Sequence, residues 1–134
     1  MTKIVLDTNI VLDLFVFRDP ATVSLQSALE SSTCQWVASQ PMRDELERVL
    51  TYPQIVPRLV FYRLNAADVL AQFDKFAQTV PIAPKASVTC KDADDQKFID
   101  LAVAHKSQLL SKDAAVLCMA KRLLALGVEV SVTL

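Results

Sequence analysis

The stretch KIVLDTN, residues 3–9, decides the fold, because an apolar run ends abruptly there in polar residues. Residues 3–6 have the length and apolar character of a buried strand, and Asp7 follows them directly. The same arrangement recurs near the other end of the chain, where residues 108–111 precede Asp113. Polar groups within an apolar stretch are expensive to bury without partners, so Asp7 indicates a site.

Short apolar runs alternate with helical patterns along the rest of the chain. Further strands are expected at 35–38 and 128–132, and helices at 21–30, 42–50, 53–62, 66–78, 95–106 and 114–126. Strands separated by helices favour a parallel sheet that is covered on both faces. We therefore predict an α/β fold, with one three-layer α/β/α domain over residues 1–134 and a central, mainly parallel sheet of four to five strands.

The residues that begin and end helices agree with this reading. Pro20 and Pro41 stand at or near first helical positions, and Asn65 is a good N-cap with Asp68 three residues on. Gly127, the only glycine, falls where the last helix should end. With a single glycine, neither a dinucleotide-binding G-x-G-x-x-G motif nor a phosphate-binding P-loop can be built.

The composition narrows the function classes further. The chain is 52% hydrophobic with a mean hydropathy of +0.31, yet no apolar run approaches the roughly 20 residues of a membrane span. No secretory signal is recognisable, so we expect a cytoplasmic protein without membrane contact. Three scattered cysteines and one histidine make no zinc set. The net charge of −1 decides little, because neutralising four acids would leave 11 acidic groups against 14 basic ones.

Four acids from distant motifs are expected at one edge of the sheet. Ligands of open parallel sheets bind outside the carboxyl ends of the strands, where Asp7 and Asp113 should lie. Glu45 falls in the second turn of the helix that follows strand 35–38, and Asp95 begins the helix that leads into the strand at 108–111. Four elements therefore bring four carboxylates to the same place.

Gathered carboxylates point to a hard divalent cation. Left alone, such anions repel one another, and some would be protonated at neutral pH. Mg²⁺ or Mn²⁺ prefers carboxylate and water ligands, and one or two ions could activate a water against a phosphodiester and stabilise the leaving oxygen. No Ser/His/Asp or Cys/His arrangement competes, because His105 is the only histidine.

Each acid also has a purely structural explanation. Asp95, with Asp92 and its neighbours, could be the acidic first turn of a helix. Asp113 could be an ordinary N-cap, and Glu45 could pair with Arg48 on a solvated face. The joint occurrence, rather than any single member, favours a site.

The motifs resemble those of the PIN-domain family, and in particular its VapC-like toxin branch. The resemblance is carried by KIVLDTNIVLDLF (residues 3–15), SQPMRDELERVL (39–50) and KDADDQKFIDLAVAHKSQLLSKDAAVL (91–117). It covers nearly the whole chain and is weakest over residues 52–89. The D-T-N opening is moderately specific alone and becomes strong together with the spaced Glu, the D-x-x-F-I-x-L-A helix and the S-x-D turn.

The resemblance implies a PIN-like fold and a Mg²⁺- or Mn²⁺-dependent ribonuclease that cuts single-stranded RNA and leaves a 5′-phosphate. It also implies a toxin whose partner is a cognate antitoxin protein. Its catalytic and metal-binding residues would be Asp7, Glu45, Asp95 and Asp113. Three supporting positions match as well: Asn9, which would orient Asp7 or a metal-bound water, Ser111, and Asp92, which helix capping explains equally well.

Other features near these motifs have two interpretations. Basic side chains close to the acids in sequence could contact an RNA backbone or simply be solvated; they are Arg43, Lys91, Lys97 and Lys112. Apolar patches at 15–17 and 59–62 could form a homodimer interface or belong to the core.

Two rival functions stay open. The chain could be a non-catalytic PIN-like module that binds RNA or protein. It could also be a phosphoryl-transfer domain with an aspartate nucleophile, although the haloacid-dehalogenase type wants D-x-D where this chain has Asn9.

Overall fold

The computed structural model of the chain describes residues 2–134 and contains a five-stranded sheet in the order β3-β2-β1-β4-β5. Every neighbouring pair is parallel. The predicted α/β class and parallel sheet are thereby confirmed. The strands are β1 (Thr2–Leu6), β2 (Cys34–Ala38), β3 (Ala77–Thr79), β4 (Gln108–Leu110) and β5 (Val130–Ser131).

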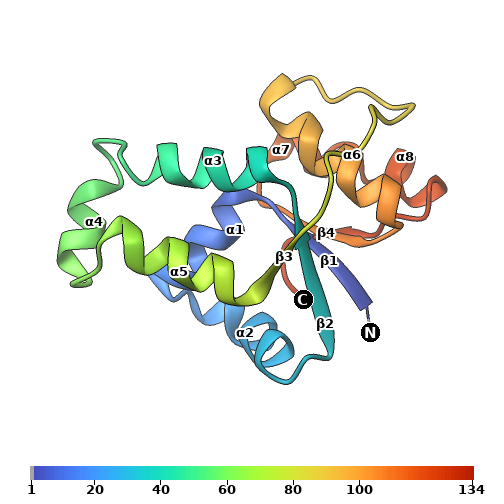
Figure 1. Cartoon of the computed structure of the whole chain (residues 1–134). Coiled ribbons are helices and arrows are strands. Elements are labelled where there is room, and N and C mark those ends of the chain that lie inside the picture. The colour runs from blue at the N-terminus through green and yellow to red at the C-terminus, as the bar shows by residue number, and fades with distance from the viewer. Residues whose placement is uncertain (1) are drawn as a thin grey trace.

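Helices occupy most of the remaining chain and lie on both sides of the sheet (Figure 1). They are α1 (Thr8–Leu12), α2 (Val23–Glu30), α3 (Gln40–Val49), α4 (Val56–Phe61), α5 (Ala66–Phe76), α6 (Gln96–His105), α7 (Ala114–Leu117) and α8 (Ala120–Ala125). A π-helical turn covers Asp13–Phe17, and 3-10 turns cover Pro20–Thr22 and Ala93–Asp95. Helix α2 packs against β2, whereas α6 packs against β1 and β4.

The strand order creates a crevice between β1 and β4. The connections from β1 through β2 to β3 progress toward one edge of the sheet, and those to β4 and β5 progress toward the other. Because crossovers between parallel strands are right-handed, the two sets of helices cover opposite faces. The direction in which the chain adds strands to the sheet reverses between β1 and β4, and ligands of such folds bind outside the carboxyl ends of the strands at that point.

The register places Asp7 at this crevice. Leu6, the last residue of β1, is paired with Leu110, the last residue of β4. The backbone N–H of Asp7 then donates to the Leu110 carbonyl over 2.9 Å. The residues that follow β4 therefore begin beside Asp7, at the same edge of the sheet.

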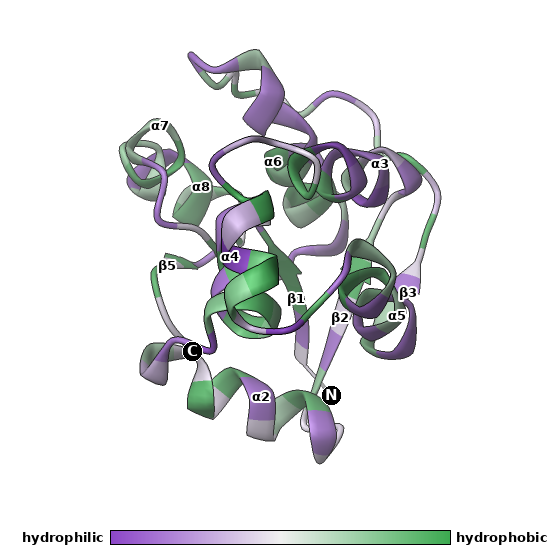
Figure 2. Ribbon diagram, turned by 90° about the vertical axis from the view of Figure 1, so that its left-hand side faces the viewer, coloured by the Kyte–Doolittle hydropathy of each residue, from purple (hydrophilic) through white to green (hydrophobic). Residues whose placement is uncertain are grey.

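The core fills the space between the sheet and its helices. Trp36 on β2 is 1% exposed and meets the Phe73 ring of α5 edge-on, with centroids 4.8 Å apart. Helices α3 and α5 carry both hydrophobic and hydrophilic residues, as helices that bury one side do (Figure 2). The close packing of these elements fixes the strand ends that carry the acids.

Three elements differ from the sequence predictions. The helix predicted over 66–78 ends at Phe76, because residues 77–79 turn extended and add a short parallel strand beside β2. The helix predicted over 114–126 is broken after Leu117 into α7 and α8. A helix directly after Asp7 is not among the predictions, yet the largely apolar segment 8–17 forms α1 and the π-helical turn.

The predicted helix ends are confirmed. Asn65 and Asp68 form a capping box at the start of α5. Pro20 and Pro41 stand in the first turns of their helices. Gly127 has a φ of +86°, which lets the chain turn from α8 toward β5.

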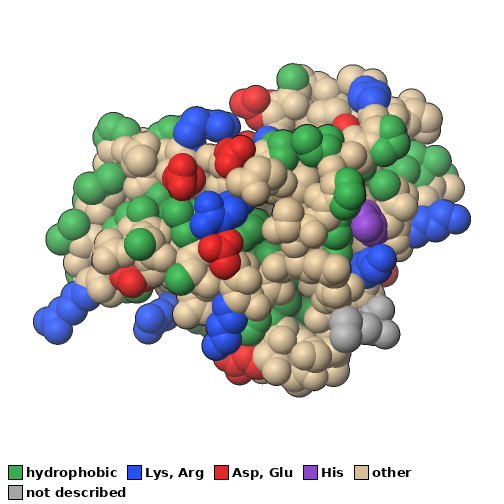
Figure 3. Space-filling model, in the orientation of Figure 1, with side chains coloured by type: hydrophobic (Ala, Val, Ile, Leu, Met, Phe, Trp, Pro, Cys, Tyr) green, Lys and Arg blue, Asp and Glu red, His purple; other side chains and the backbone are tan. Residues whose placement is uncertain are grey.

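The apolar patches at 15–17 and 59–62 differ in their exposure to solvent. Phe15 is buried in the core, whereas Val60 and Phe61 of α4 are 71% and 75% exposed. Hydrophobic side chains accordingly reach the surface at the left, over α4, and others do so toward the upper right, while acidic and basic side chains lie side by side near the middle of this face (Figure 3). Self-association through α4 stays a prediction. Among residues 2–134, no helix is both long enough and apolar enough to cross a membrane.

Candidate metal centre

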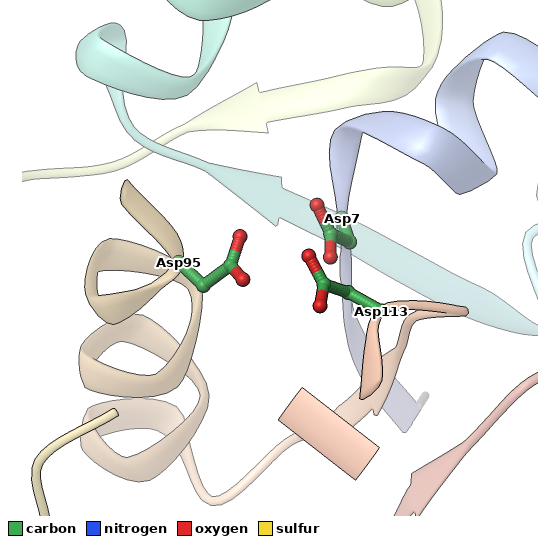
Figure 4. Close-up of side chains that lie close together, drawn as sticks. All are labelled: Asp7, Asp95 and Asp113. Carbon is green, nitrogen blue, oxygen red and sulfur yellow. The ribbon is translucent and has the colours of Figure 1, made fainter. Parts of the chain in front are cut away.

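Three of the four predicted acids converge at the crevice between β1 and β4. Carboxylate oxygens of Asp7, Asp95 and Asp113 all lie within 4.8 Å of one another. Asp7 follows β1, Asp95 ends the 3-10 turn before α6, and Asp113 lies in the turn after β4. Figure 4 shows their side chains pointing toward one another from these three elements.

Asp7 is held in place by two hydrogen bonds. Its Oδ1 accepts from the backbone N–H of Thr8 over 2.7 Å, and its Oδ2 accepts from the Ser111 hydroxyl over 2.6 Å. Burial raises the pKa of Asp7 and outweighs these two bonds, which lower it; the charges of Glu45 and Asp113 raise it further. A nearby cation would therefore favour the ionised form of Asp7.

Asp113 combines helix capping with a place in the cluster. Its Oδ1 accepts from the backbone N–H of Ala115 over 2.9 Å, which caps α7. Its own backbone N–H donates to the Ser111 hydroxyl over 3.0 Å. Ser111, which is fully buried, thus connects Asp113 to Asp7. Asp113 is therefore the N-cap of α7, as one interpretation of the sequence expects, and its carboxylate also belongs to the acidic cluster.

Asp95 is the least satisfied acid of the cluster. It is 7% exposed, and its Oδ2 has no hydrogen-bond partner among residues 2–134. Burial raises the pKa of Asp95 to about 8, and the charges of Asp7, Asp113 and Asp92 contribute to the rise. An acid that only favoured a helix dipole would face water, so the purely structural explanation does not account for Asp95.

Glu45 lies beside the three aspartates but is engaged differently. Its Oε2 accepts from the Thr8 hydroxyl, and its Oε1 accepts from the Lys97 ammonium over 2.7 Å. Its charge still raises the pKa of Asp7. The structure therefore brings together three of the four acids and pairs the fourth with a lysine.

The other predicted site residues border the cluster. Asn9 accepts, through its side-chain oxygen, a hydrogen bond of 3.4 Å from the backbone N–H of Lys112, so it links the turn after β4 to the start of α1. Asp92 is exposed and caps the 3-10 turn by accepting from the backbone N–H of Asp94 over 3.0 Å. The bonds to Asp7 come instead from Thr8 and Ser111.

Thr8 and Lys97 are the residues whose roles the sequence analysis misses. Thr8 is the middle residue of the D-T-N motif, so the sequence could have indicated that it belongs to the site. Its hydrogen-bond partner could not be inferred, because Glu45 is 37 residues away. Two other basic side chains near the acids also form ion pairs. Lys112 Nζ lies 2.5 Å from Asp13 Oδ2, and Arg43 Nε lies 2.8 Å from Asp74 Oδ1.

The donor set fits a hard divalent cation. All three clustered side chains offer carboxylate oxygens, which Mg²⁺ and Mn²⁺ prefer. The buried, unpartnered Oδ2 of Asp95 is the observation that calls for a ligand, because unpaired buried polar atoms are rare in folded proteins. A cation there would neutralise the repulsion within the cluster.

The cluster lies outside the cavity that the π-helical turn forms with α2 and α5. A cavity of about 450 Å³ lies between the π-helical turn, α2 and α5, with Leu14, Gln26 and Val69 among its lining residues and none of the clustered aspartates. The acids instead meet at the strand ends.

Comparisons with known proteins agree with this geometry. The family profile described as PIN domain matches residues 3–115. Among solved structures, the fold is similar to a chain of VapBC2 from Rickettsia felis bound to a DNA fragment from their promoter, with a TM-score of 0.65 and 13% sequence identity. That similarity covers 96% of this chain and 98% of the other. No curated protein matches the sequence.

Proposed function

The chain belongs to the PIN-domain family, and from this premise we propose that it is a metal-dependent endoribonuclease. The observation that carries the proposal is the cluster of Asp7, Asp95 and Asp113, of which the first two are buried and one carboxylate oxygen has no partner within the described chain. Such a cluster is expensive to maintain without a cation, so a binding role explains it better than a structural one.

The three aspartates would hold the ion, and their neighbours would set their orientation. Bound Mg²⁺ or Mn²⁺ would lower the pKa of a water and stabilise charge at the reacting phosphate. Ser111 and the Thr8 backbone N–H fix both oxygens of Asp7, so that its carboxylate is oriented before the ion arrives. Capping of α7 fixes Asp113 in the same way. Ionisation of Asp95 would release the proton that it holds at neutral pH in the absence of metal.

Single-stranded RNA is the substrate we propose, with cleavage that leaves a 5′-phosphate. This part of the proposal rests on the motif resemblance. The fold's similarity to a VapBC2 chain supports, in addition, a toxin role for this chain and a cognate antitoxin as its partner. The site residues of the proposed nuclease are Asp7, Asp95 and Asp113 as ligands, with Glu45, Asn9, Ser111 and Asp92 around them.

Substitution of the ligands tests the nuclease. Asp7→Asn and Asp95→Asn should each lower Mg²⁺-dependent cleavage of a single-stranded RNA by about 100-fold or more, since each removes one charged ligand. Glu129→Gln is the control: it too replaces a carboxylate by its amide, but at an exposed residue just before β5, away from the strand ends that carry the acids. Circular dichroism would verify that all variants are folded. Undiminished cleavage in either aspartate variant, with the fold intact, would overturn the assignment.

The toxin role has its own test. Induced expression of the chain in a bacterial host should arrest growth, and Asp7→Asn should abolish the arrest at equal protein level. If the neighbouring reading frame encodes the antitoxin, co-expression of its product should relieve the arrest, and the product should co-purify with the chain. Growth that is unaffected by an active nuclease would restrict the proposal to the enzyme alone.

A non-catalytic PIN-like module is the alternative outcome. It would bind RNA or a protein partner without metal-dependent cleavage. RNA binding by the wild-type chain together with no cleavage in Mg²⁺ or Mn²⁺ would favour that function.

A further inference from the structure

Lys97 and Glu45 form an ion pair beside the aspartate cluster. Lys97 belongs to the first turn of α6, two residues after Asp95. Its ammonium donates to Glu45 Oε1 over 2.7 Å and to the Asp94 carbonyl over 2.5 Å. The two side chains are 24% and 14% exposed, so the pair is partly shielded from water.

Glu45 is fully satisfied by the chain, in contrast to Asp95. One Glu45 oxygen accepts from the Thr8 hydroxyl and the other from Lys97. The Oδ2 of Asp95 has no such partner among residues 2–134. Glu45 therefore already has a cationic partner, the Lys97 ammonium, whereas Asp95 has none within the described chain.

We propose that Lys97 acts as a fixed second cation of this centre, so that the chain binds one divalent ion at Asp7, Asp95 and Asp113 instead of a pair of ions. This inference rests on the proposed metal centre and specifies its stoichiometry. Lys97 is a positioning residue: it holds Glu45 and places a fixed positive charge beside the centre. A second ion on Glu45 would have to displace the ammonium or lie beside it, and both arrangements cost electrostatic energy.

The same geometry predicts how Lys97 affects the single ion. An ammonium close to the centre repels a divalent cation, so its removal should strengthen metal binding. Lys97→Met keeps an unbranched side chain of similar length and removes the ammonium, which lies 5.0 Å from the centroid of the Phe98 ring, together with its charge and its hydrogen bonds to Glu45 and the Asp94 carbonyl. Lys97→Arg keeps the charge and should restore wild-type binding.

Calorimetric titration with Mn²⁺ of the full chain tests the proposal. The wild type should bind one Mn²⁺ per chain, and Lys97→Met should bind the first ion about tenfold more tightly, the size expected for one unit charge near a divalent ion at a partly exposed position. Lys97→Arg should match the wild type. Lys121→Met, which removes an exposed charge on α8, is the matched control and should also match it.

The outcomes separate this inference from the proposed function. Two Mn²⁺ ions per wild-type chain would overturn it, and so would equal affinity of the wild type and Lys97→Met, while the metal centre itself would stand. Absence of Mn²⁺ binding in every variant would overturn the metal centre and the role of Lys97 together.

Discussion

Ser111 forms hydrogen bonds with two of the three aspartates of the centre. Its hydroxyl donates to Asp7 Oδ2 and accepts from the backbone N–H of Asp113, and it is fully buried. Side chains that orient metal ligands in this manner affect metal affinity almost as strongly as the ligands themselves. The small hydroxyl two residues before the last acid is therefore required by geometry.

Ser111→Ala should weaken Mn²⁺ binding by about tenfold and lower the free energy of unfolding by about 1–2 kcal/mol, because it leaves two buried polar groups unpaired. Calorimetric titration and urea denaturation would measure the two effects. Ser107→Ala is the matched control, since the Ser107 hydroxyl is buried without a partner in the described chain and its loss should cost little. Equal behaviour of the two variants would contradict the role given to Ser111.

Asp95 should make the metal-free protein sensitive to pH. Its pKa rises from an ordinary value of 3.8 to about 8 in the folded chain, so the folded state binds a proton that the unfolded state has released. Stability from this group is therefore fully present below about pH 4 and is lost as the pH rises to about 8. A cation reverses the loss by replacing the proton.

Asp95→Asn should remove this dependence. In EDTA at pH 8 the variant should melt about 5 °C above the wild type, whereas at pH 5 the difference should be much smaller. Thermal unfolding followed by circular dichroism at both pH values is the measurement. Parallel pH profiles for the two proteins would contradict the assigned titration of Asp95.

At the scale of elements, the ends of helices and strands determine where the acids lie. The α8–β5 junction depends on Gly127, whose φ of +86° other residues rarely adopt. A Cβ added there would meet the Lys106 side chain at an ordinary 3.7 Å, so any cost of substitution comes from the backbone. The junction sets the start of the outermost strand beside β4.

Gly127→Ala should therefore lower the free energy of unfolding by about 1 kcal/mol. RNA cleavage at a temperature well below the melting transition should be unchanged, because the junction lies away from the strand ends that carry the acids. Urea denaturation would measure the stability change. A variant as stable as the wild type would show that this turn does not need the left-handed conformation.

Elements with a strong local pattern could be predicted from the sequence, and elements fixed by tertiary contacts could not. The apolar run before Asp7 and the capping box at Asn65 are local signals, and both are confirmed. Strand β3 has no apolar run of its own and exists because residues 77–79 pair with β2. The break between α7 and α8 carries no proline or glycine, so nothing in the local sequence announced it.

The candidate site divides in the same way. Strand ends and topology place Asp7 and Asp113, because parallel strands deliver their following residues to one edge. Pairing of Glu45 with Lys97 and Thr8 joins residues 52 and 37 positions apart, and it depends on how α3 packs beside α6 and α1. Side-chain partners over such separations cannot be inferred from spacing.

At the scale of the whole molecule, metal binding should be coupled to folding. The cluster draws its aspartates from the start, the later part and the end region of the chain, so it exists only in the folded state. A ligand that binds only the folded state stabilises it by about 2.7 kcal/mol at 100 times its dissociation constant.

Mn²⁺ at that excess should therefore raise the melting temperature of the wild type by about 5–10 °C, and Asp7→Asn should show little of this shift. Differential scanning calorimetry with and without Mn²⁺ would measure both. Glu129→Gln again provides the control and should respond as the wild type does. A shift of equal size in the Asp7 variant would mean that the ion binds elsewhere.

The central claim is that Asp7, Asp95 and Asp113 form one cation site at the crevice between β1 and β4. A crystal of the wild-type chain soaked in Mn²⁺ and measured near the manganese absorption edge tests it most directly. The account predicts an anomalous peak about 2 Å from a carboxylate oxygen of each of the three aspartates. A fully soaked crystal without a peak there, or with its only strong peak at other residues, would contradict it.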